Sequence, residues 1–355
     1  MPAFSDFLDQ MTAPAQLVEP QAEAGMLRCT ACAHRCRIRP GRRGVCQVRF
    51  NRDGELRVPW GYVAAAQVDP IEKKPFAHVL PGSRVLTFGM LGCDFHCGFC
   101  QNWVTSQTLR DPNAGGSETV QAVTPHQLVD YAVRTGCKLI ASSYNEPLIT
   151  AEWAVAIFQE ARQAGLLTCM VSNGNATPEV LAFLRPHLDA YKIDLKTMQA
   201  QHYRELGGVL QHVLDTIQAA HALGLWLEVV TLVIPGFNDS PAELWDAARF
   251  LAGVSPDIPW HVTAFHPDYK MTDRPATAAP ALQRAADIGQ EAGLRYVYAG
   301  NLPGRVGSLE DTLCPHCQTV LIRRRGYSIL ENHLTRAHAC PRCAAPIPGL
   351  WSVVP

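Results

Sequence analysis

The sequence predicts an α/β fold, in which helices pack outside a mostly parallel sheet, flanked by two small cysteine-rich modules. Two observations support this prediction. Short apolar runs with strand composition alternate with helix-like segments over most of the 355 residues, and eleven of the 13 cysteines fall into three compact groups. The first observation indicates a layered core. The second indicates metal-binding modules, because clustered thiols in a reducing compartment bind metal more often than they form disulfides.

Seven apolar runs have the length and composition of strands. They span residues 85–89, 139–143, 167–172, 190–194, 227–233, 260–264 and 296–299. Segments with helical spacing lie between most of these runs, and several begin with Thr-Pro or Ser-Pro, a common helix start. They span residues 125–135, 151–164, 178–184, 209–223, 241–252 and 280–292. Such repeated alternation predicts a parallel sheet that is either doubly wound or partly closed into a barrel.

Three parts are expected along the chain. Residues 1–60 would form an N-terminal extension and a four-cysteine module in a turn-prone segment rich in Gly and Arg. Residues 70–303 contain the strand–helix alternation. Residues 304–355 form a tail rich in Cys, His and Arg, in which the alternation has ended.

Bulk composition predicts a soluble globular protein. Hydrophobic residues make up 47% and charged residues 18% of the chain, which fits a sizeable core. The 31 Lys and Arg balance the 32 Asp and Glu, so no global attraction to nucleic acid or anionic membrane is expected. The N-terminus has no basic start followed by an apolar run, and no segment approaches the roughly 20 apolar residues that span a bilayer. We therefore expect a cytoplasmic protein without membrane association.

Polar or metal-ligating side chains follow every predicted strand. In chain order they are Cys93, Cys97 and Cys100; Asn145 and Glu146; Ser172 and Asn173; Asp194 and Lys196; Asn238 and Asp239; His266; and Asn301. In parallel α/β folds the ligand site lies at the carboxyl ends of the strands. One such residue could be a helix cap or a turn residue, but seven coincident strand ends predict a shared site.

Three cysteines with Cys-x3-Cys-x2-Cys spacing lie in the segment GMLGCDFHCGFCQNW, directly after the first predicted strand. Three thiolates are one ligand short of a tetrahedral zinc site. They can instead hold three irons of a [4Fe-4S] cluster and leave the fourth iron open to the amino and carboxylate groups of a ligand. This spacing, with the aromatic Phe99 before the last cysteine, resembles the signature of the radical S-adenosylmethionine (SAM) superfamily.

Further motifs narrow the resemblance. The strings DPIEKKPF, SYNEP, SNGN, IDLK and LVIPGFND are similar to those of the glycyl-radical (pyruvate formate-lyase) activating enzyme branch. The chain most closely resembles the radical SAM member of the AmmeMemoRadiSam system, over about residues 26–350. The resemblance implies a partial (β/α)6-type TIM barrel for residues 70–303, with a zinc-ribbon-like module behind it.

The resemblance also implies roles for individual residues. Cys93, Cys97 and Cys100 would ligate the cluster, and Asn145 and Glu146 would meet the amino group of SAM, since a carboxylate stabilises an ammonium group. The other implied contacts with the cofactor are Phe99 beside the cluster, Ser172 and Asn173 at the methionyl or ribose part, Asp194 and Lys196 at the carboxylate or sugar, and Val233 to Gly236 at the adenine. His261 or His266 would lie near the reaction centre, and His266 is our candidate catalytic residue.

The implied activity is reductive cleavage of SAM to methionine and a 5′-deoxyadenosyl radical, which abstracts hydrogen from a substrate. That substrate, which the sequence does not identify, could be a small molecule, an RNA or a peptide. The implied partners are an electron donor such as flavodoxin or ferredoxin, and the Amme-type and Memo-type proteins. One alternative is a glycyl-radical enzyme activase, which we favour less because such activases seldom carry a C-terminal zinc ribbon. The other is a nucleic-acid-binding zinc module on a degenerate α/β scaffold, against which the intact cysteine triplet argues.

The C-terminal cysteines form two CPxC motifs, Cys314 to Cys317 and Cys340 to Cys343. This spacing is typical of a zinc ribbon with four thiolate ligands. A mixed set in which His333 and His338 join the first motif, or an auxiliary iron–sulfur cluster, are the alternatives.

The N-terminal cysteines are Cys29, Cys32, Cys36 and Cys46, and their uneven spacing suits either zinc or an auxiliary [4Fe-4S] cluster. Both cysteine modules contain several arginines. These form a solvated face in the simpler interpretation, and would bind a phosphate-bearing substrate or RNA in the other.

Overall fold

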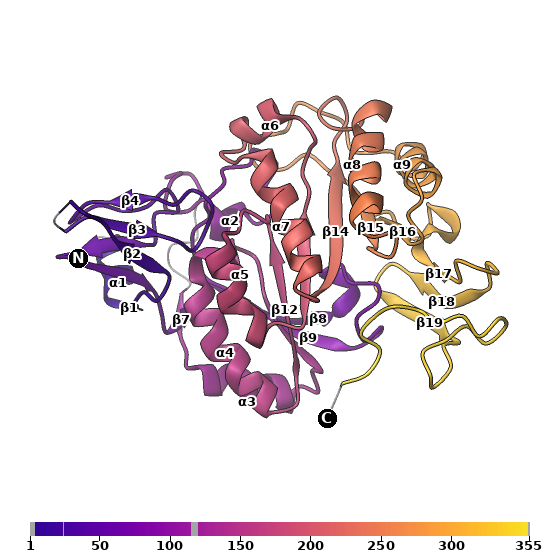
Figure 1. Ribbon diagram of the computed structural model, residues 1–355, viewed down its shortest axis with the longest axis horizontal. Coiled ribbons are helices and arrows are strands. Elements are labelled where there is room, and N and C mark those ends of the chain that lie inside the picture. The colour runs from indigo at the N-terminus through magenta and orange to yellow at the C-terminus, as the bar shows by residue number, and fades with distance from the viewer. Residues whose placement is uncertain (1–3, 24, 115–119, 354–355) are drawn as a thin grey trace.

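A curved eight-stranded sheet forms the centre of the molecule (Figure 1). The computed structural model describes residues 4–23, 25–114 and 120–353. Along the sheet the strands follow one another in the order β16-β15-β14-β13-β12-β11-β9-β8. Their bounds are β8 Ala65–Pro70, β9 Arg84–Gly89, β11 Leu139–Ser142, β12 Leu167–Ser172, β13 Ala190–Asp194, β14 Trp226–Val233, β15 Trp260–Ala264 and β16 Val297–Gly300. The strands from β9 to β16 are parallel and β8 runs antiparallel to β9, which confirms the predicted α/β fold with a parallel central sheet.

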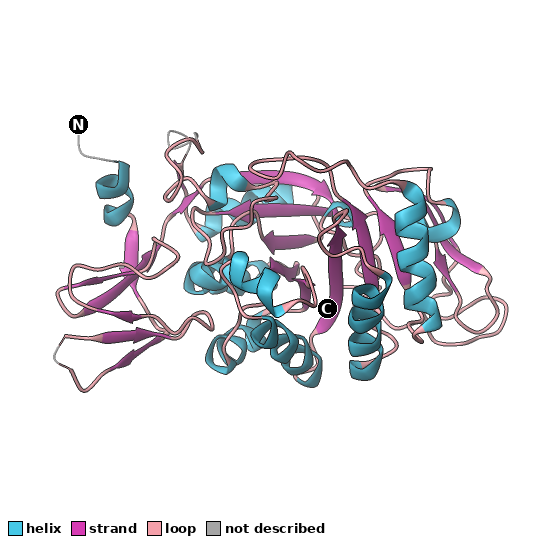
Figure 2. Ribbon diagram, turned by 90° about the horizontal axis from the view of Figure 1, so that it is seen from above, coloured by secondary structure: helices cyan, strands magenta, loops and turns pink. Residues whose placement is uncertain are grey.

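Helices pack along the outer side of this sheet (Figure 2). The main ones are α3 Pro125–Arg134, α4 Ala151–Gln163, α5 Pro178–Leu184, α7 Leu210–Ala222, α8 Pro241–Val254 and α9 Ala279–Glu291. Three of them begin at Thr-Pro or Ser-Pro, where the hydroxyl of Thr124, Thr177 or Ser240 accepts a hydrogen bond from the backbone N–H three residues on. These caps satisfy amide groups that the first helical turn leaves free, which is why the sequence signal locates the helix starts closely.

The sheet is buried on both faces, as parallel sheets usually are. All residues of β11 and β15 are buried. Between the sheet and the helices lie large side chains such as Phe158, which contacts Phe88 of β9, and Trp260, which meets Gly289 of α9. Gly289 of α9 allows the closest approach, because a β-carbon there would lie 2.9 Å from both Trp260 and Val297. The glycine thereby lets α9 pack directly on the edge of the sheet.

A module of short strands precedes the sheet and lies at one end of the molecule (Figure 1). It consists of α1 Phe4–Gln10, β1 Thr12–Pro14, β2 Val18–Pro20, β3 Leu27–Cys29, β4 Arg37–Ile38, β5 Phe50–Arg52 and β6 Glu55–Pro59. These strands form two three-stranded sheets, β1-β6-β5 and β2-β3-β4. A short pair, β7 Tyr62–Val63 with β10 Gln121–Ala122, follows.

The C-terminal module lies near the opposite end, beside β16 (Figure 1). It contains β17 Thr312–Leu313, β18 Val320–Arg325 and β19 Ser328–Asn332, which form one antiparallel sheet. The chain then returns to the segment between β8 and β9, where Leu350 pairs with Val79 in a parallel bridge. Short helices complete the fold: α2 Trp103–Ser106, α6 Ala200–Glu205, and the 3₁₀ turns η1 Ile71–Lys73, η2 Pro147–Thr150, η3 Arg185–His187 and η4 Gly307–Glu310.

One observation refines the predicted organisation of the sheet. The sheet begins with β8 at Ala65, a strand that the sequence analysis does not predict because its residues are mostly half-buried or exposed. In the described part of the chain, no helix is long and apolar enough to cross a membrane.

Candidate functional site

A cavity of about 1000 Å³ lies at the carboxyl ends of the parallel strands. Twelve of the fourteen residues predicted to be catalytic or cofactor-binding line it. They are Cys93, Cys97, Phe99, Cys100, Asn145, Glu146, Ser172, Asn173, Asp194, Lys196, His261 and His266. The topology brings them together because parallel strands deliver their carboxyl ends to one rim.

The loop that carries the three central cysteines is held in place from several directions. The Phe95 N–H donates to Cys93 Sγ at 3.4 Å, and Cys100 Sγ lies 3.2 Å from the hydroxyl of Ser106 on α2. The side-chain amide of Gln107 donates to the Phe95 carbonyl at 3.1 Å. The three thiols therefore face the cavity from a fixed loop.

Asp94, between the first two cysteines, joins this loop to the one that follows β12. Its carboxylate is 2% exposed and accepts hydrogen bonds from the side-chain amides of Asn173 at 2.7 Å and Asn175 at 2.8 Å. The sequence analysis did not single out Asp94. The sequence offers one signal for Asp94. It is a charged residue inside a cysteine motif, and a strand end rich in Asn, the hydrogen-bond partner found here, follows later in the chain.

Glu146 is buried beside the cavity and positions the same loop. Its carboxylate accepts hydrogen bonds from the Ser172 hydroxyl at 2.7 Å, the Asn173 N–H at 2.7 Å and the Leu148 N–H at 3.1 Å. Burial, followed by the nearby charge of Asp94, raises the pKa of Glu146 to about 8. A cationic group bound next to it would favour the carboxylate form again.

Asn145 has a different role from its neighbour. Its side-chain oxygen accepts the Met90 N–H at 3.0 Å, at the point where the chain leaves β9 toward the cysteines. Asn145 thus ties the end of β11 to the start of the cysteine loop.

Asp194 lies between two lysines at the end of β13. Lys192 forms an ion pair with one of its oxygens, and Lys196 Nζ lies 3.1 Å from the other. Burial opposes ionisation, but the two ammonium groups outweigh it and lower the pKa of Asp194 to about 2. The trio therefore carries a net positive charge beside the cavity. The sequence-based prediction did not include Lys192, although residues two apart in a strand share a face and Lys192 therefore lies on the same face of β13 as Asp194.

The segment predicted to face adenine, Val233 to Gly236, lies beside the cavity lining rather than in it. Val233 is fully buried, and neither it nor Gly236 is among the residues that line the cavity. Val230 and Leu232, which alternate with Val233 along β14, line it instead. The position of the adenine ring, and with it the implied role of Val233 to Gly236, stays a prediction.

The two candidate histidines differ in environment. His261 is 5% exposed and its Nε2 lies 2.6 Å from a carboxylate oxygen of Glu228, which is fully buried. His266 is exposed at the cavity, with its Nε2 3.0 Å from the amide nitrogen of Gln101. Glu228 also accepts the backbone N–H groups of Ala77 and His78 at 2.8 and 2.9 Å. His261 is therefore held by structural contacts, whereas His266 is accessible.

The C-terminal module and the segment after β8 supply the remaining wall. Arg324, Arg325 and Tyr327 of the β18–β19 hairpin line the cavity. The Arg324 guanidinium is 7% exposed and donates to the Thr312 hydroxyl at 2.6 Å and to the Ala77 carbonyl at 2.7 Å. The sequence does not reveal this contact, because Ala77 and Arg324 are far apart along the chain.

Comparison with known proteins identifies the family of this chain. The family model described as the radical SAM superfamily matches residues 88–251. An uncharacterized protein of Methanocaldococcus jannaschii is 37% identical over 300 residues, which cover 84% of this chain and 87% of that protein. The chain belongs to the radical SAM superfamily. This radical SAM protein is accordingly an enzyme, and membership implies a [4Fe-4S] cluster and SAM.

Two more distant matches have names that state an activity. The pyruvate formate-lyase-activating enzyme of Staphylococcus aureus is 22% identical over 196 residues, covering 52% of this chain and 76% of the relative. Among solved structures, a radical SAM methyltransferase from Sphaerobacter thermophilus covers 84% of this chain and 80% of its own, with 14% identity and a TM-score of 0.48. The family match does not favour the alternative of a nucleic-acid-binding module on a degenerate scaffold.

The residues of this radical SAM protein fit the implied cluster. Three thiols from one loop face the same cavity. Within the described residues, no three metal-ligating atoms at this loop lie within 4.8 Å of one another. A single zinc ion would gather them more closely, whereas cluster irons at separate corners would keep them apart.

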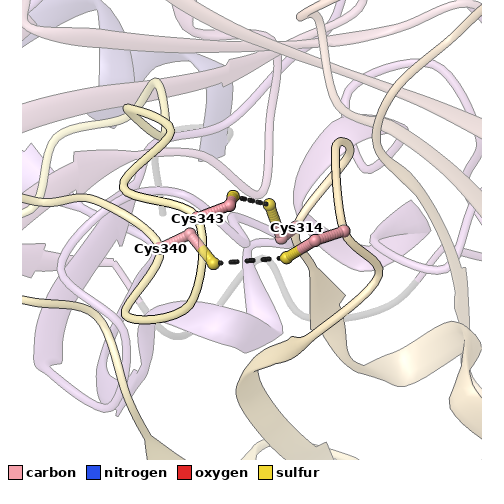
Figure 3. A group of neighbouring side chains, drawn as sticks. Cys314, Cys340 and Cys343 are labelled. Carbon is pink, nitrogen blue, oxygen red and sulfur yellow. Dashed lines mark hydrogen bonds between the residues drawn. The ribbon is translucent and has the colours of Figure 1, made fainter.

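The C-terminal cysteines have the compact arrangement (Figure 3). The Sγ atoms of Cys314, Cys317, Cys340 and Cys343 all lie within 4.8 Å of one another. Two pairs, Cys314 with Cys343 and Cys317 with Cys340, are 3.5 Å apart. His333 and His338 do not belong to this group, and His333 contacts Glu331 instead. The four-cysteine alternative is thus the one that the structure assembles.

Proposed function

We propose that the cavity binds SAM beside a [4Fe-4S] cluster held by Cys93, Cys97 and Cys100, and that the enzyme abstracts hydrogen from a small-molecule substrate in the same cavity. One observation carries this proposal: residues from seven successive strand ends, three of them cysteines, line one cavity. Its volume of about 1000 Å³ lies at the upper end of the usual range for ligand pockets, about 300–1000 Å³. There is room for SAM and a second small molecule.

The bound cluster would supply the electron for reductive cleavage of SAM to methionine and a 5′-deoxyadenosyl radical. The chain's own residues bind and orient SAM. The buried carboxylate of Glu146 suits its amino group, while Lys192 and Lys196 offer positive charge to its carboxylate or ribose hydroxyls. Val230 and Leu232 offer an apolar surface for adenine.

The substrate would lie against the wall formed by the C-terminal hairpin and the segment after β8. Arg325 and Tyr327 on that wall are exposed and line the same cavity as His266. An RNA substrate is less well supported, because most arginines of the N-terminal module pair with carboxylates. The pairs are Arg35 with Glu179, Arg37 and Arg39 with Glu23, and Arg43 with Asp9.

The finer family assignment rests on sequence motifs. The strings IEKKPF, YNEP and SNGN support membership of the AmmeMemoRadiSam system, with Amme-type and Memo-type proteins as partners and a flavodoxin or ferredoxin as electron donor. The compact C-terminal cysteine group supports structural zinc there, since tetrahedral zinc thiolate sites place their sulfurs about 3.8 Å apart.

The proposal is tested by measuring 5′-deoxyadenosine. The protein is purified without oxygen, reconstituted with iron and sulfide, reduced with dithionite and given SAM. We expect 5′-deoxyadenosine and methionine to form in equal amounts, slowly without substrate and faster with it. A fully reconstituted protein that forms neither product would contradict the proposal.

A further inference from the structure

The N-terminal cysteines differ from the C-terminal set in how far apart their sulfur atoms lie. In the described residues, no three of the Sγ atoms of Cys29, Cys32, Cys36 and Cys46 lie within 4.8 Å of one another, whereas all four C-terminal Sγ atoms do. Tetrahedral zinc with Zn–S bonds of about 2.3 Å requires sulfurs about 3.8 Å apart. Within the described residues, neither the N-terminal set nor Cys93, Cys97 and Cys100 therefore forms the compact group that a zinc site requires.

The environment of the N-terminal set is also that of a buried centre. Cys29, Cys32 and Cys46 are each 5% exposed, and Cys36 is half-buried. The guanidinium of Arg49, which is 1% exposed, has its Nη1 3.6 Å from Cys29 Sγ. N–H groups directed at cysteine sulfur stabilise the extra negative charge of a reduced iron–sulfur cluster and so raise its potential.

This module is fixed directly against the central cysteine loop. A β-carbon on Gly92, the residue before Cys93, would lie 2.9 Å from the carbonyl oxygen of Cys46 and 2.8 Å from Val48. Gly92 also has a φ of +93°, so both its conformation and its surroundings require glycine. The backbone at Cys46 therefore packs directly against the residue that precedes Cys93.

A second set of contacts fixes the module to the loop after β12. The Ala33 N–H donates to the Asn175 carbonyl at 2.8 Å, and the Thr177 hydroxyl donates to the Thr30 carbonyl at 2.5 Å. Asn175 in turn donates to Asp94, inside the central cysteine motif. The N-terminal module is thus held in a fixed position relative to the central loop, with its cysteines at the contact.

We propose that Cys29, Cys32, Cys36 and Cys46 bind a second iron–sulfur cluster, of the [4Fe-4S] type, and not zinc. All four irons would have a cysteine ligand, so this cluster has no open iron and does not compete for SAM. The assignment concerns a site outside the cavity and does not depend on the proposed function.

Metal counting on matched variants tests this assignment. The Cys93→Ala/Cys97→Ala/Cys100→Ala variant removes the central ligands, Cys29→Ala/Cys36→Ala removes half of the N-terminal set, and Cys314→Ala/Cys317→Ala serves as the control at the compact site. Each is purified without oxygen and reconstituted, its fold is checked by circular dichroism, and iron and zinc are quantified alongside Mössbauer spectra. The wild type should bind about eight irons and one zinc per chain.

The central variant decides the question, because it leaves the N-terminal module intact. We expect it to keep about four irons with the Mössbauer signature of a [4Fe-4S] cluster. The N-terminal variant should also keep about four, and the C-terminal control should lose zinc alone. A central variant without iron, whether it holds a second zinc or no metal at the N-terminal set, would overturn the assignment. If the central variant keeps all the iron that the wild type binds, the assignment at the N-terminal cysteines is supported. The proposed function, which needs a cluster at Cys93, Cys97 and Cys100, would then be contradicted.

Discussion

Replacing Cys97 with alanine is expected to abolish the formation of 5′-deoxyadenosine from SAM. Cys97 is the middle ligand of the central triplet, and its loss leaves two thiols at a site that needs three to hold a cluster. We expect product to fall to the background of the assay and about four irons per chain to be lost, assuming one cluster at this site. Product is measured chromatographically after anaerobic reconstitution.

The matched control for this variant is Cys137→Ala. Cys137 is also buried, at 4% exposed compared with 7% for Cys97, but it lies outside all three cysteine groups. Both variants remove a buried thiol at a similar cost to packing, so a general loss of stability would affect both. Substantial activity in Cys97→Ala, or an equal loss in Cys137→Ala, would contradict the role given to the triplet.

Among the variants proposed, replacing Glu152 with alanine is expected to cause the largest decrease in the free energy of unfolding. Glu152 forms a buried ion pair with Arg49, and both side chains are 1% exposed. The same carboxylate accepts the backbone N–H groups of Gln16 and Leu17, both at 3.2 Å. Removing one partner of a buried ion pair costs about 3–5 kcal/mol, because the remaining charge is left uncompensated. The free energy of unfolding is measured by urea titration.

Two further variants separate this explanation from a general effect of shortening a glutamate. Glu291→Ala removes an exposed carboxylate and should change the free energy of unfolding by less than about 0.5 kcal/mol. The double variant Arg49→Met/Glu152→Leu removes both charges and should recover the part of the loss that the uncompensated Arg49 charge causes. The N–H groups of Gln16 and Leu17 lack this acceptor in both variants. A double variant as unstable as Glu152→Ala would show that the ion pair is not the cause.

Much of the fold could be predicted because the strands of a parallel sheet are continuous apolar runs and its helices have clear starts. The prediction of 190–194 matches β13, and that of 178–184 matches α5, which Thr177 caps. The strand β8 was missed because its residues alternate weakly between exposed and buried positions. An antiparallel edge strand of this kind carries little of the pattern that marks the strands of a buried parallel sheet.

Site residues could be predicted where their chemical type and their position at the end of a strand mark them. Residues that contribute through contacts with distant parts of the chain could not be predicted. The Arg49–Glu152 pair joins positions 103 residues apart, and Arg324 reaches Ala77 across 247 residues. The contribution of Val230 and Leu232 to the cavity could not be predicted either, because burial on both faces of β14 hides which face points inward.

The most direct test of the account is whether SAM binds at the central cluster. Reconstituted protein is reduced with dithionite, and its electron paramagnetic resonance spectrum is recorded before and after SAM is added. The account predicts that SAM changes the spectrum of the wild type, since an open iron accepts its amino and carboxylate groups, and leaves that of the Cys93→Ala/Cys97→Ala/Cys100→Ala variant unchanged. A wild-type spectrum that saturating SAM does not alter would contradict the account.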